Sequence, residues 1–277
     1  MGLSIRDIIQ KEKGLNVSEI LYIASYALAE KKEKLIGKFD DPLEPEEVET
    51  ILRLIAERKS GKPFAYIVGK KEFYSYEFLV NQAVLIPRPE TEILVEEAER
   101  VLREKKPRRI LDMGTGSGVI GITLSIRTGF QVYCVDVSKE ALFVAKKNAR
   151  LHKVEERIVF ICSDMFSAIG ERIKFDLVVA NLPYVDEKDI DSLPKEVKDY
   201  EPRIALCGGK RGLELIQRFL GGLTSYLSPL GTVLLEIGGK RQLRSIEPLL
   251  LQKGFDVKVI KDYSGRERVI RATWKSL

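Results

Sequence analysis

The stretch FDLVVANLPYV, residues 175–185, ends a short apolar run with a polar turn. An apolar run of this length is typical of a parallel strand that is buried on both faces, and residues 181–184 follow it as a turn. In an open α/β sheet, ligands bind beyond the carboxyl ends of the strands, which is where this turn would lie. Ordinary turn chemistry also explains an Asn and a Pro at a strand end, so the four residues alone leave both interpretations open.

The side chains of this turn suit one task, which is to hold a planar NH2 group. The side-chain carbonyl of Asn181 can accept one N–H, and the main-chain carbonyl of Leu182 can accept the other. Pro183 has a fixed φ and no N–H, so it stiffens the turn and keeps Leu182 extended. Tyr184 adds an aromatic face that can cover a flat group. These four residues are the candidate catalytic residues.

Strands and helices alternate around this stretch from residue 109 to the end of the chain. We expect strands at 109–113, 131–136, 157–161, 175–180, 231–237, 255–261 and 267–273, and helices near 117–128, 138–152, 212–228 and 240–253. The alternation predicts a parallel sheet with helices on both faces. The last two strands are joined by a short turn and should pair as a hairpin, which makes one strand antiparallel. The fold class is therefore α/β, with a seven-stranded Rossmann-like sheet.

The chain ahead of the sheet has two parts. Apolar stripes of helical period over residues 1–62 predict a small helical domain, with Ser18 as one helix cap. Residues 63–86 are rich in β-prone side chains and predict a hairpin linker that turns at Asn81–Gln82. Residues 87–277 form the expected sheet domain.

A glycine-rich turn, Gly114-Thr115-Gly116-Ser117-Gly118, joins the strand at 109–113 to the following helix. Glycines let the backbone approach a ligand closely, with helix N–H groups facing it. Asp136 ends the next strand, where an acid can bind both hydroxyls of a ribose. This pattern also fits a nicotinamide-binding Rossmann domain. Asp112 favours a different ligand, because a carboxylate there suits the sulfonium and amino group of S-adenosylmethionine and would repel a pyrophosphate.

The third strand closes with a further pair of candidate ligand residues. Asp164 can accept a hydrogen bond from an adenine amino group while Met165 lies on the ring; the alternative role for Asp164 is a helix cap. The candidate cofactor-binding residues are therefore Asp112, Gly114, Thr115, Gly116, Ser117, Gly118, Asp136, Asp164, Met165 and Asn181.

A methyl-donor site and a turn that grips an NH2 group form a coherent pair. The nitrogen of an amide or aryl amine is weakly nucleophilic because its lone pair is delocalised, so proximity and alignment are the main catalytic tools. No strong general base is required, since the proton becomes acidic once the methyl group has transferred. The chain has a single histidine, His152, and the lack of a catalytic histidine fits such a mechanism.

Composition narrows the remaining possibilities. The 277 residues contain no apolar run of membrane-spanning length, and we expect a cytoplasmic protein without membrane association. The three cysteines are far apart and not in metal-ligand spacing, so no metal site is expected. Basic and acidic residues are mixed along the first sixty positions, which disfavours direct binding to nucleic acid despite the net charge of +5. We expect a monomer.

With these residues in place, the chain resembles the HemK family, the peptide chain release factor N(5)-glutamine methyltransferases. The most specific shared block is residues 86–92, Ile-Pro-Arg-Pro-Glu-Thr-Glu. The other shared motifs are residues 63–69, 84–85, 112–118, 200–202, 205–206 and 235–238. The resemblance implies a seven-stranded methyltransferase domain behind a helical domain that helps to hold the protein substrate. It also implies transfer of the methyl group of S-adenosylmethionine to the glutamine of the Gly-Gly-Gln loop in bacterial release factors, with S-adenosylhomocysteine as product.

One departure from the family pattern keeps a second substrate open. The family usually has Asn-Pro-Pro-Tyr, whereas Leu182 stands at the second position here. The Leu carbonyl is still present, so we expect function with a looser turn. Asn-Leu-Pro-Tyr is also the form found in ribosomal RNA adenine dimethyltransferases, and an adenine amino group presents the same planar NH2. An N6-adenine methyltransferase acting on RNA or DNA is therefore the alternative, and residues 186–209 are either a mobile flap over the substrate or a connecting loop.

Overall fold

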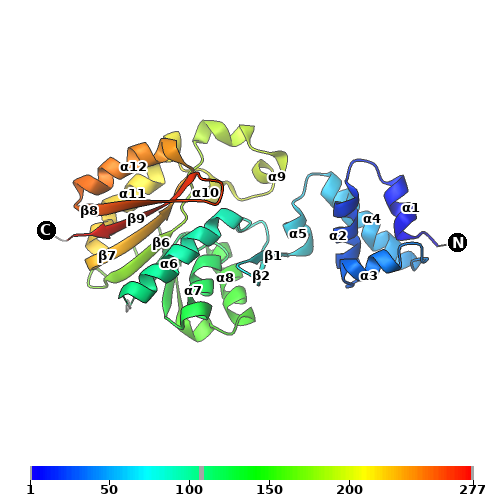
Figure 1. Ribbon diagram of the computed structural model, residues 1–277, viewed down its shortest axis with the longest axis horizontal. Coiled ribbons are helices and arrows are strands. Elements are labelled where there is room, and N and C mark those ends of the chain that lie inside the picture. The colour runs from blue at the N-terminus through cyan, green and yellow to red at the C-terminus, as the bar shows by residue number, and fades with distance from the viewer. Residues whose placement is uncertain (1, 106–108, 276–277) are drawn as a thin grey trace. The chain divides into compact units, whose positions relative to one another are not determined.

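The computed structural model describes residues 2–105 and 109–275. The chain divides into two compact units, one that ends at Gly69 and one that begins at Lys70 (Figure 1). The first unit continues beyond the domain boundary that we expected at residue 62. Each unit has its own hydrophobic core, and the two are described separately below.

The first unit is helical, as predicted. Its helices are α1 (Ile5–Lys11), α2 (Val17–Ala27), α3 (Lys32–Gly37), α4 (Pro45–Lys59) and α5 (Phe64–Val68). Isoleucines and leucines from α1 to α4 form its core, including Ile8, Ile23 and Ile51. Asn16, and not the predicted Ser18, caps α2: its side chain accepts from the N–H of Glu19 while the Glu19 carboxylate accepts from the N–H of Asn16. This capping box satisfies two N–H groups at once, which a cap at Ser18 would not.

A two-stranded hairpin opens the second unit, but not where the sequence predicted it. Strands β1 (Lys70–Phe73) and β2 (Tyr76–Leu79) pair antiparallel around a turn at Tyr74–Ser75. Both turn residues have positive φ, 52° and 63°, as the hairpin twist requires. The predicted turn at Asn81–Gln82 exists but leads into no strand, and residues 64–68 are helical. Helix α5 and this turn lie within residues 63–86, for which the sequence predicts a hairpin linker.

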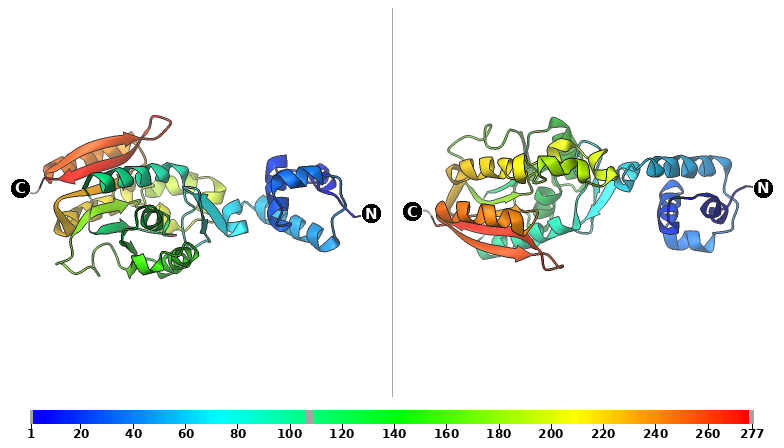
Figure 2. Two further views of the ribbon diagram at one scale, coloured as in Figure 1. Left: turned by 60° about the horizontal axis from the view of Figure 1, so that its bottom comes forward. Right: turned by 90° about the horizontal axis from the view of Figure 1, so that it is seen from above.

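The predicted seven-stranded α/β sheet is confirmed. It consists of β3 (Ile110–Met113), β4 (Val132–Asp136), β5 (Ile158–Cys162), β6 (Phe175–Ala180), β7 (Leu227–Glu236), β8 (Phe255–Lys261) and β9 (Glu267–Trp274). The strand order is β5-β4-β3-β6-β7-β9-β8 (Figures 1 and 2). Strand β9 pairs antiparallel with both β7 and β8, as the terminal hairpin predicted. Since β3 and β6 are adjacent and parallel, their carboxyl ends lie side by side.

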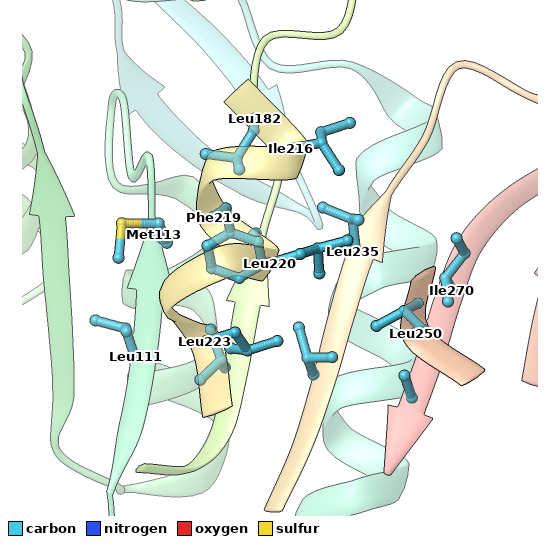
Figure 3. Close-up of a cluster of buried hydrophobic side chains, with 14 of the residues drawn as sticks. Leu111, Met113, Leu182, Ile216, Phe219, Leu220, Leu223, Leu235, Leu250 and Ile270 are labelled. Atoms are coloured by element: carbon cyan, nitrogen blue, oxygen red, sulfur yellow. The ribbon is translucent and has the colours of Figure 1, made fainter. Parts of the chain in front are cut away.

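Helices cover both faces of this sheet. Helices α6 (Glu92–Lys105), α7 (Val119–Thr128) and α8 (Lys139–Leu151) pack on one face, and α11 (Glu214–Leu223) and α12 (Lys240–Gln252) on the other. Along β6, Leu177 and Val179 face the core on the side of α6, α7 and α8, while Val178 faces the core on the side of α11 and α12. Figure 3 shows α11 side chains lying against β3 and β7. Burial of both faces explains why central strands such as β6 are mainly apolar.

The segment between β6 and α11 contains short helices. These are η3 (Glu187–Ser192), α9 (Lys195–Lys198), α10 (Arg203–Leu206) and η4 (Lys210–Gly212). Val185 and Cys207 form an isolated bridge that brings the two ends of the segment together. These short helices and the bridge give the segment a defined structure beyond the carboxyl end of β6.

One buried amide connects the hairpin to the glycine turn. Asn148 of α8 accepts from the N–H of Leu79 at 2.7 Å and donates to the carbonyl of Leu79 at 3.0 Å and of Ser117 at 2.8 Å. Its side chain has no exposed surface. Loss of a partner in such a place leaves buried donors and acceptors unsatisfied.

We predict that Asn148→Ala lowers the free energy of unfolding of this unit by about 2–4 kcal/mol, because three hydrogen bonds are lost in a dry site. The fluorescence of Trp274, the single tryptophan of the chain, reports on this unit during urea denaturation. Lys147→Ala, at an exposed position of the same helix, is the matched control and should change stability by less than about 0.5 kcal/mol. Equal stability of Asn148→Ala and wild type would contradict the role of this amide.

Candidate active site

The glycine turn follows β3 in a conformation that side chains rarely adopt. Gly114, Gly116 and Gly118 all have positive φ, between 56° and 84°. The N–H groups of Gly114 and Thr115 both donate to the carbonyl of Val135 in the neighbouring strand, at 2.8 and 2.9 Å. The turn is therefore tied to the end of β4, and its backbone forms one edge of a cavity.

Asp112 supports this turn from behind. Its side chain has no exposed surface, and Oδ2 accepts from the Thr115 hydroxyl at 2.6 Å and from the N–H of Gly121 at 3.0 Å. Burial raises the pKa of Asp112 to about 6, and the two hydrogen bonds offset part of that shift. Asp112 is not among the described residues that line the cavity. The structure therefore shows a contact of Asp112 with the turn, and its expected contact with a cationic ligand stays a prediction.

Asp136 lies at the end of β4 and borders the cavity. Oδ2 accepts from the N–H of Gly116 at 2.8 Å, and Oδ1 accepts from the N–H of Ser138 at 2.9 Å. Burial raises the pKa of Asp136, and these backbone hydrogen bonds act against the shift. Each carboxylate oxygen has two lone pairs, so both can accept a further hydrogen bond from a ligand. The geometry suits the predicted contact with two hydroxyl groups.

Asp164 and Met165 lie on another side of the same cavity. No helix begins at Asp164, and its carboxylate accepts from Arg218 of α11 at 2.8 Å, so the helix-cap interpretation is wrong. The neighbouring Ser163 takes the local capping role instead, since its hydroxyl accepts from the N–H of Ala168. Met165 has a φ of 51° and packs in part against the core below the cavity.

The first cavity gathers most of the predicted cofactor-binding residues. Its volume is about 310 Å³, in the range of small-molecule sites. The predicted residues that line it are Gly114, Thr115, Gly116, Ser117, Asp136, Asp164, Met165 and Asn181; Asp112 and Gly118 lie outside the lining. Gly118 instead begins α7, where a Cβ atom would lie 2.6 Å from Ile122 Cδ1.

A second cavity lies on the other side of the Asn181 turn. It has a volume of about 290 Å³, and all four predicted catalytic residues, Asn181, Leu182, Pro183 and Tyr184, line it. The first three also line the first cavity, so the turn lies where the two cavities meet. Leu182 directs its side chain into the core, and only 3% of it is exposed. Its apolar side chain is therefore accommodated without disturbing the turn.

The segment after the turn forms the outer wall of this second cavity. Leu193, Val197 and Leu206 make that wall apolar. Glu201 is buried and pairs with Arg88, which lines both cavities, and it also accepts from the N–H of Ile86 at 3.2 Å. Burial raises the pKa of Glu201, and the Arg88 charge opposes this. The wall is thus attached to residues 86–88 by a partly buried ion pair.

Sequence reasoning assigned no role to Thr91 and Glu236, although both lie in motifs shared with the HemK family. The Asn181 side-chain amide donates through Nδ2 to the Thr91 hydroxyl at 3.1 Å. Glu236, at the end of β7, lines the second cavity, and its Oε1 accepts from the Tyr184 hydroxyl at 3.3 Å. Burial raises the pKa of Glu236 to about 7. Apart from those motifs, the only sequence signal for Thr91 and Glu236 was that each is a polar residue next to a helix start or a strand end.

Two further features bear on the class of site. Within residues 2–105 and 109–275, no cluster of three or more His, Cys, Asp or Glu side chains could hold a metal ion. The described part of the chain also contains no helix that is both long and apolar enough to cross a membrane.

Comparisons with known proteins agree with this geometry. The family model "Methyltransferase small domain" matches residues 89–196, and the "PrmC N-terminal domain" model matches residues 10–69. A release factor glutamine methyltransferase of Clostridium botulinum is 38% identical over 236 residues, which cover 84% of this chain and 83% of the relative. That of Bacillus subtilis is 37% identical over 265 residues, with coverage of 93% and 90%.

Solved structures confirm the fold of the second unit. The ribosomal protein L11 methylase of Lactobacillus delbrueckii superposes with a TM-score of 0.52 at 23% identity, and the match covers 70% of this chain and 82% of that one. Likeness at this level of identity supports the methyltransferase fold alone. The sequence relatives go further, because their identity extends over most of both chains. The chain therefore belongs to the release factor glutamine methyltransferase family.

Proposed function

We propose that this protein transfers a methyl group from S-adenosylmethionine to the side-chain amide nitrogen of the glutamine in the Gly-Gly-Gln motif of bacterial release factors. The observation that carries the proposal is the position of the Asn181 turn between two adjoining cavities. The first cavity has the polar groups that a nucleoside requires, and the second combines apolar walls with the polar groups of Arg88, Asn181 and Glu236.

The first cavity fits S-adenosylmethionine in shape and chemistry. Asp136 would accept from the ribose hydroxyls, and Asp164 with Met165 would hold the adenine. The glycine turn lets the backbone approach the methionine part without side-chain obstruction. Bound there, the cofactor supplies an electrophilic methyl carbon on a positively charged sulfur.

The second cavity fits a glutamine side chain. Its walls are apolar at Leu85, Leu193 and Val197, which suits the methylene stem, while its polar groups gather at the Asn181 turn. The two glycines that precede the glutamine carry no side chains, so the substrate loop can enter a narrow site. Asn181 Oδ1 and the Leu182 carbonyl would then each accept one N–H of the amide.

Catalysis in this arrangement rests on alignment. Two acceptors fix the plane of the amide, raise the electron density on its nitrogen and hold that nitrogen toward the first cavity. Pro183 restricts the turn, and Tyr184 covers the amide plane. The proton that the nitrogen loses after transfer needs no strong base. The proton then passes to water.

The helical unit is the proposed site of substrate recognition. It coincides with the match to the PrmC N-terminal domain model. Helix α2 exposes Val17, Tyr22 and Tyr26, each more than two-fifths accessible, and these side chains are available to a protein partner.

The proposal predicts that labelled S-adenosylmethionine transfers its label to a release factor, at the Gly-Gly-Gln glutamine, and not to RNA. Asn181→Ala should lower kcat about a hundredfold or more, because one preorganised contact to the reacting group is lost. Cofactor affinity should change little. Label in RNA, with none in release factor, would favour the adenine methyltransferase alternative.

Asn181→Asp sharpens this test because it keeps an acceptor oxygen and adds a negative charge. That charge favours the positively charged ground state over a transition state in which the charge fades. We expect S-adenosylmethionine to bind at least as tightly as in the wild type and methyl transfer to be slower. Single-turnover rates at saturating cofactor measure it; wild-type rates in both variants would reduce Asn181 to a turn residue.

For the cofactor site, Asp136→Ala should weaken S-adenosylmethionine binding by about 1.5–3 kcal/mol for each hydrogen bond lost from the carboxylate. Asp136→Asn keeps the shape and one acceptor, so its affinity should be intermediate. Isothermal titration calorimetry measures both. Unchanged affinity in Asp136→Ala would contradict the assigned role, and tight NADH binding by the wild type would contradict the identity of the cofactor.

For the helical unit, deletion of residues 1–69 should leave cofactor affinity largely intact and raise KM for an intact release factor. A short Gly-Gly-Gln peptide should be affected less, because it cannot reach a remote surface in either form. Steady-state kinetics with both substrates separate the two effects. An equal loss on protein and peptide, with the fold intact by circular dichroism, would show that the unit does not recognise substrate.

A further inference from the structure

The Thr91 hydroxyl lies between the Asn181 amide and the Glu236 carboxylate. Nδ2 of Asn181 donates to Thr91 Oγ1 at 3.1 Å. On its other side, the Thr91 hydroxyl lies near the carboxyl of Glu236 and is the largest influence that lowers the pKa of that group. Only 3% of Thr91 and 1% of Glu236 are exposed, so bulk water does not replace these partners.

The chemistry of the three groups decides which of them donates a proton and which accepts. An ionised carboxylate can only accept, and a hydroxyl has a single proton to donate. Glu236 Oε2 is buried and has no hydrogen-bond partner within the described chain, so its lone pairs can attract the Thr91 proton. With its proton directed there, Thr91 can only accept from Asn181.

The direction determines which end of the Asn181 amide meets the acceptor. Nδ2 is engaged by Thr91, so Oδ1 is the atom left for the cavity. A flipped amide would present NH2 to the NH2 of the substrate, and two donors cannot hydrogen-bond to each other. The two amide orientations are similar in shape, so packing alone does not select between them.

We propose that Thr91 and Glu236 are positioning residues, which orient the Asn181 amide so that its oxygen faces the methyl acceptor. This inference rests on the proposed function for its kinetic consequence, while the orientation itself is a property of the protein alone. The relay begins at the end of β7 and ends at the turn after β6, and Thr91 connects them from the short 3-10 helix η1 (Pro89–Thr91), which directly precedes α6. Tyr184 is held by the same carboxylate.

Protonation of Glu236 would remove the direction, because a carboxylic acid can donate to Thr91. Burial raises the pKa of Glu236 to about 7; Arg268 and the Tyr184 hydroxyl lower it in part, and Glu90 raises it. Arg88 also acts on Tyr184 from the second cavity. The productive orientation is therefore favoured above pH 7, where the carboxyl is charged, and is lost as the pH falls through that value.

Nuclear magnetic resonance tests the orientation without any substrate. The side-chain amide cross-peaks of Asn181, identified by their absence in Asn181→Ala, should shift with pH around a midpoint of about 7 in the wild type. In Glu236→Gln, which has similar shape and does not titrate, that shift should vanish. The inference would be overturned if the chemical shifts of these cross-peaks did not change between pH 6 and 8 in the wild type, or if they changed identically in both proteins.

Kinetics test its consequence. Thr91→Val keeps the volume but loses the hydroxyl, and should lower kcat/KM for release factor about tenfold at saturating cofactor, which corresponds to one hydrogen bond. Thr91→Ser restores the hydroxyl and should stay within about threefold of wild type. Thr123→Val is the matched control, since Thr123 is equally buried on α7 and its hydroxyl has no partner within the described chain.

The outcomes separate this inference from the proposed function. Full activity in Thr91→Val, or no rescue by Thr91→Ser at unchanged cofactor affinity, overturns the relay and leaves the methyltransferase proposal standing. No transfer to release factor by the wild type overturns the proposed function, and the cross-peak titration still decides the orientation of Asn181.

Discussion

The close approach of two turns at the carboxyl edge of the sheet determines the rest of the site. A Cβ atom on Gly114 would lie 3.1 Å from Leu182 Cδ2 and 3.7 Å from the Asn181 carbonyl oxygen. Since β3 and β6 are adjacent and parallel, the glycine turn and the Asn181 turn lie side by side at the ends of these strands. A side chain at Gly114 would press on Leu182, and the proposed in-line transfer requires the two turns to stay close.

Two buried carboxylates hold the glycine turn in place by accepting hydrogen bonds from it. Asp112 supports the glycine turn through Thr115 and Gly121, and Asp136 holds Gly116. Burying these groups raises their pKa values, which shows that the fold keeps them at some cost. The cost is offset by a rigid backbone around the first cavity, and such preorganisation would serve the proposed transfer, which uses no strong base.

Local chemistry predicted some of the structure and failed where packing decided. The strand from Phe175 to Ala180 and the terminal hairpin follow from apolar runs and chain connectivity, and both were found as predicted. The first hairpin was misplaced because its turn uses Tyr74 and Ser75 at positive φ, which only tertiary contacts stabilise. Asn81–Gln82 has better turn residues but no partner strand beyond it.

For the site, the sequence alone determined the kinds of groups present: the glycine turn, the acids at strand ends and the Asn-x-Pro-Tyr turn, each of which has a chemistry independent of its neighbours. Only the tertiary structure decided what those groups contact. Asp112 was placed behind the turn and Asp164 against Arg218, while Glu236 reached Tyr184 from a strand 52 residues away in the chain. Hydrogen-bond direction and burial depend on such distant partners, and they are fixed only when the strands align.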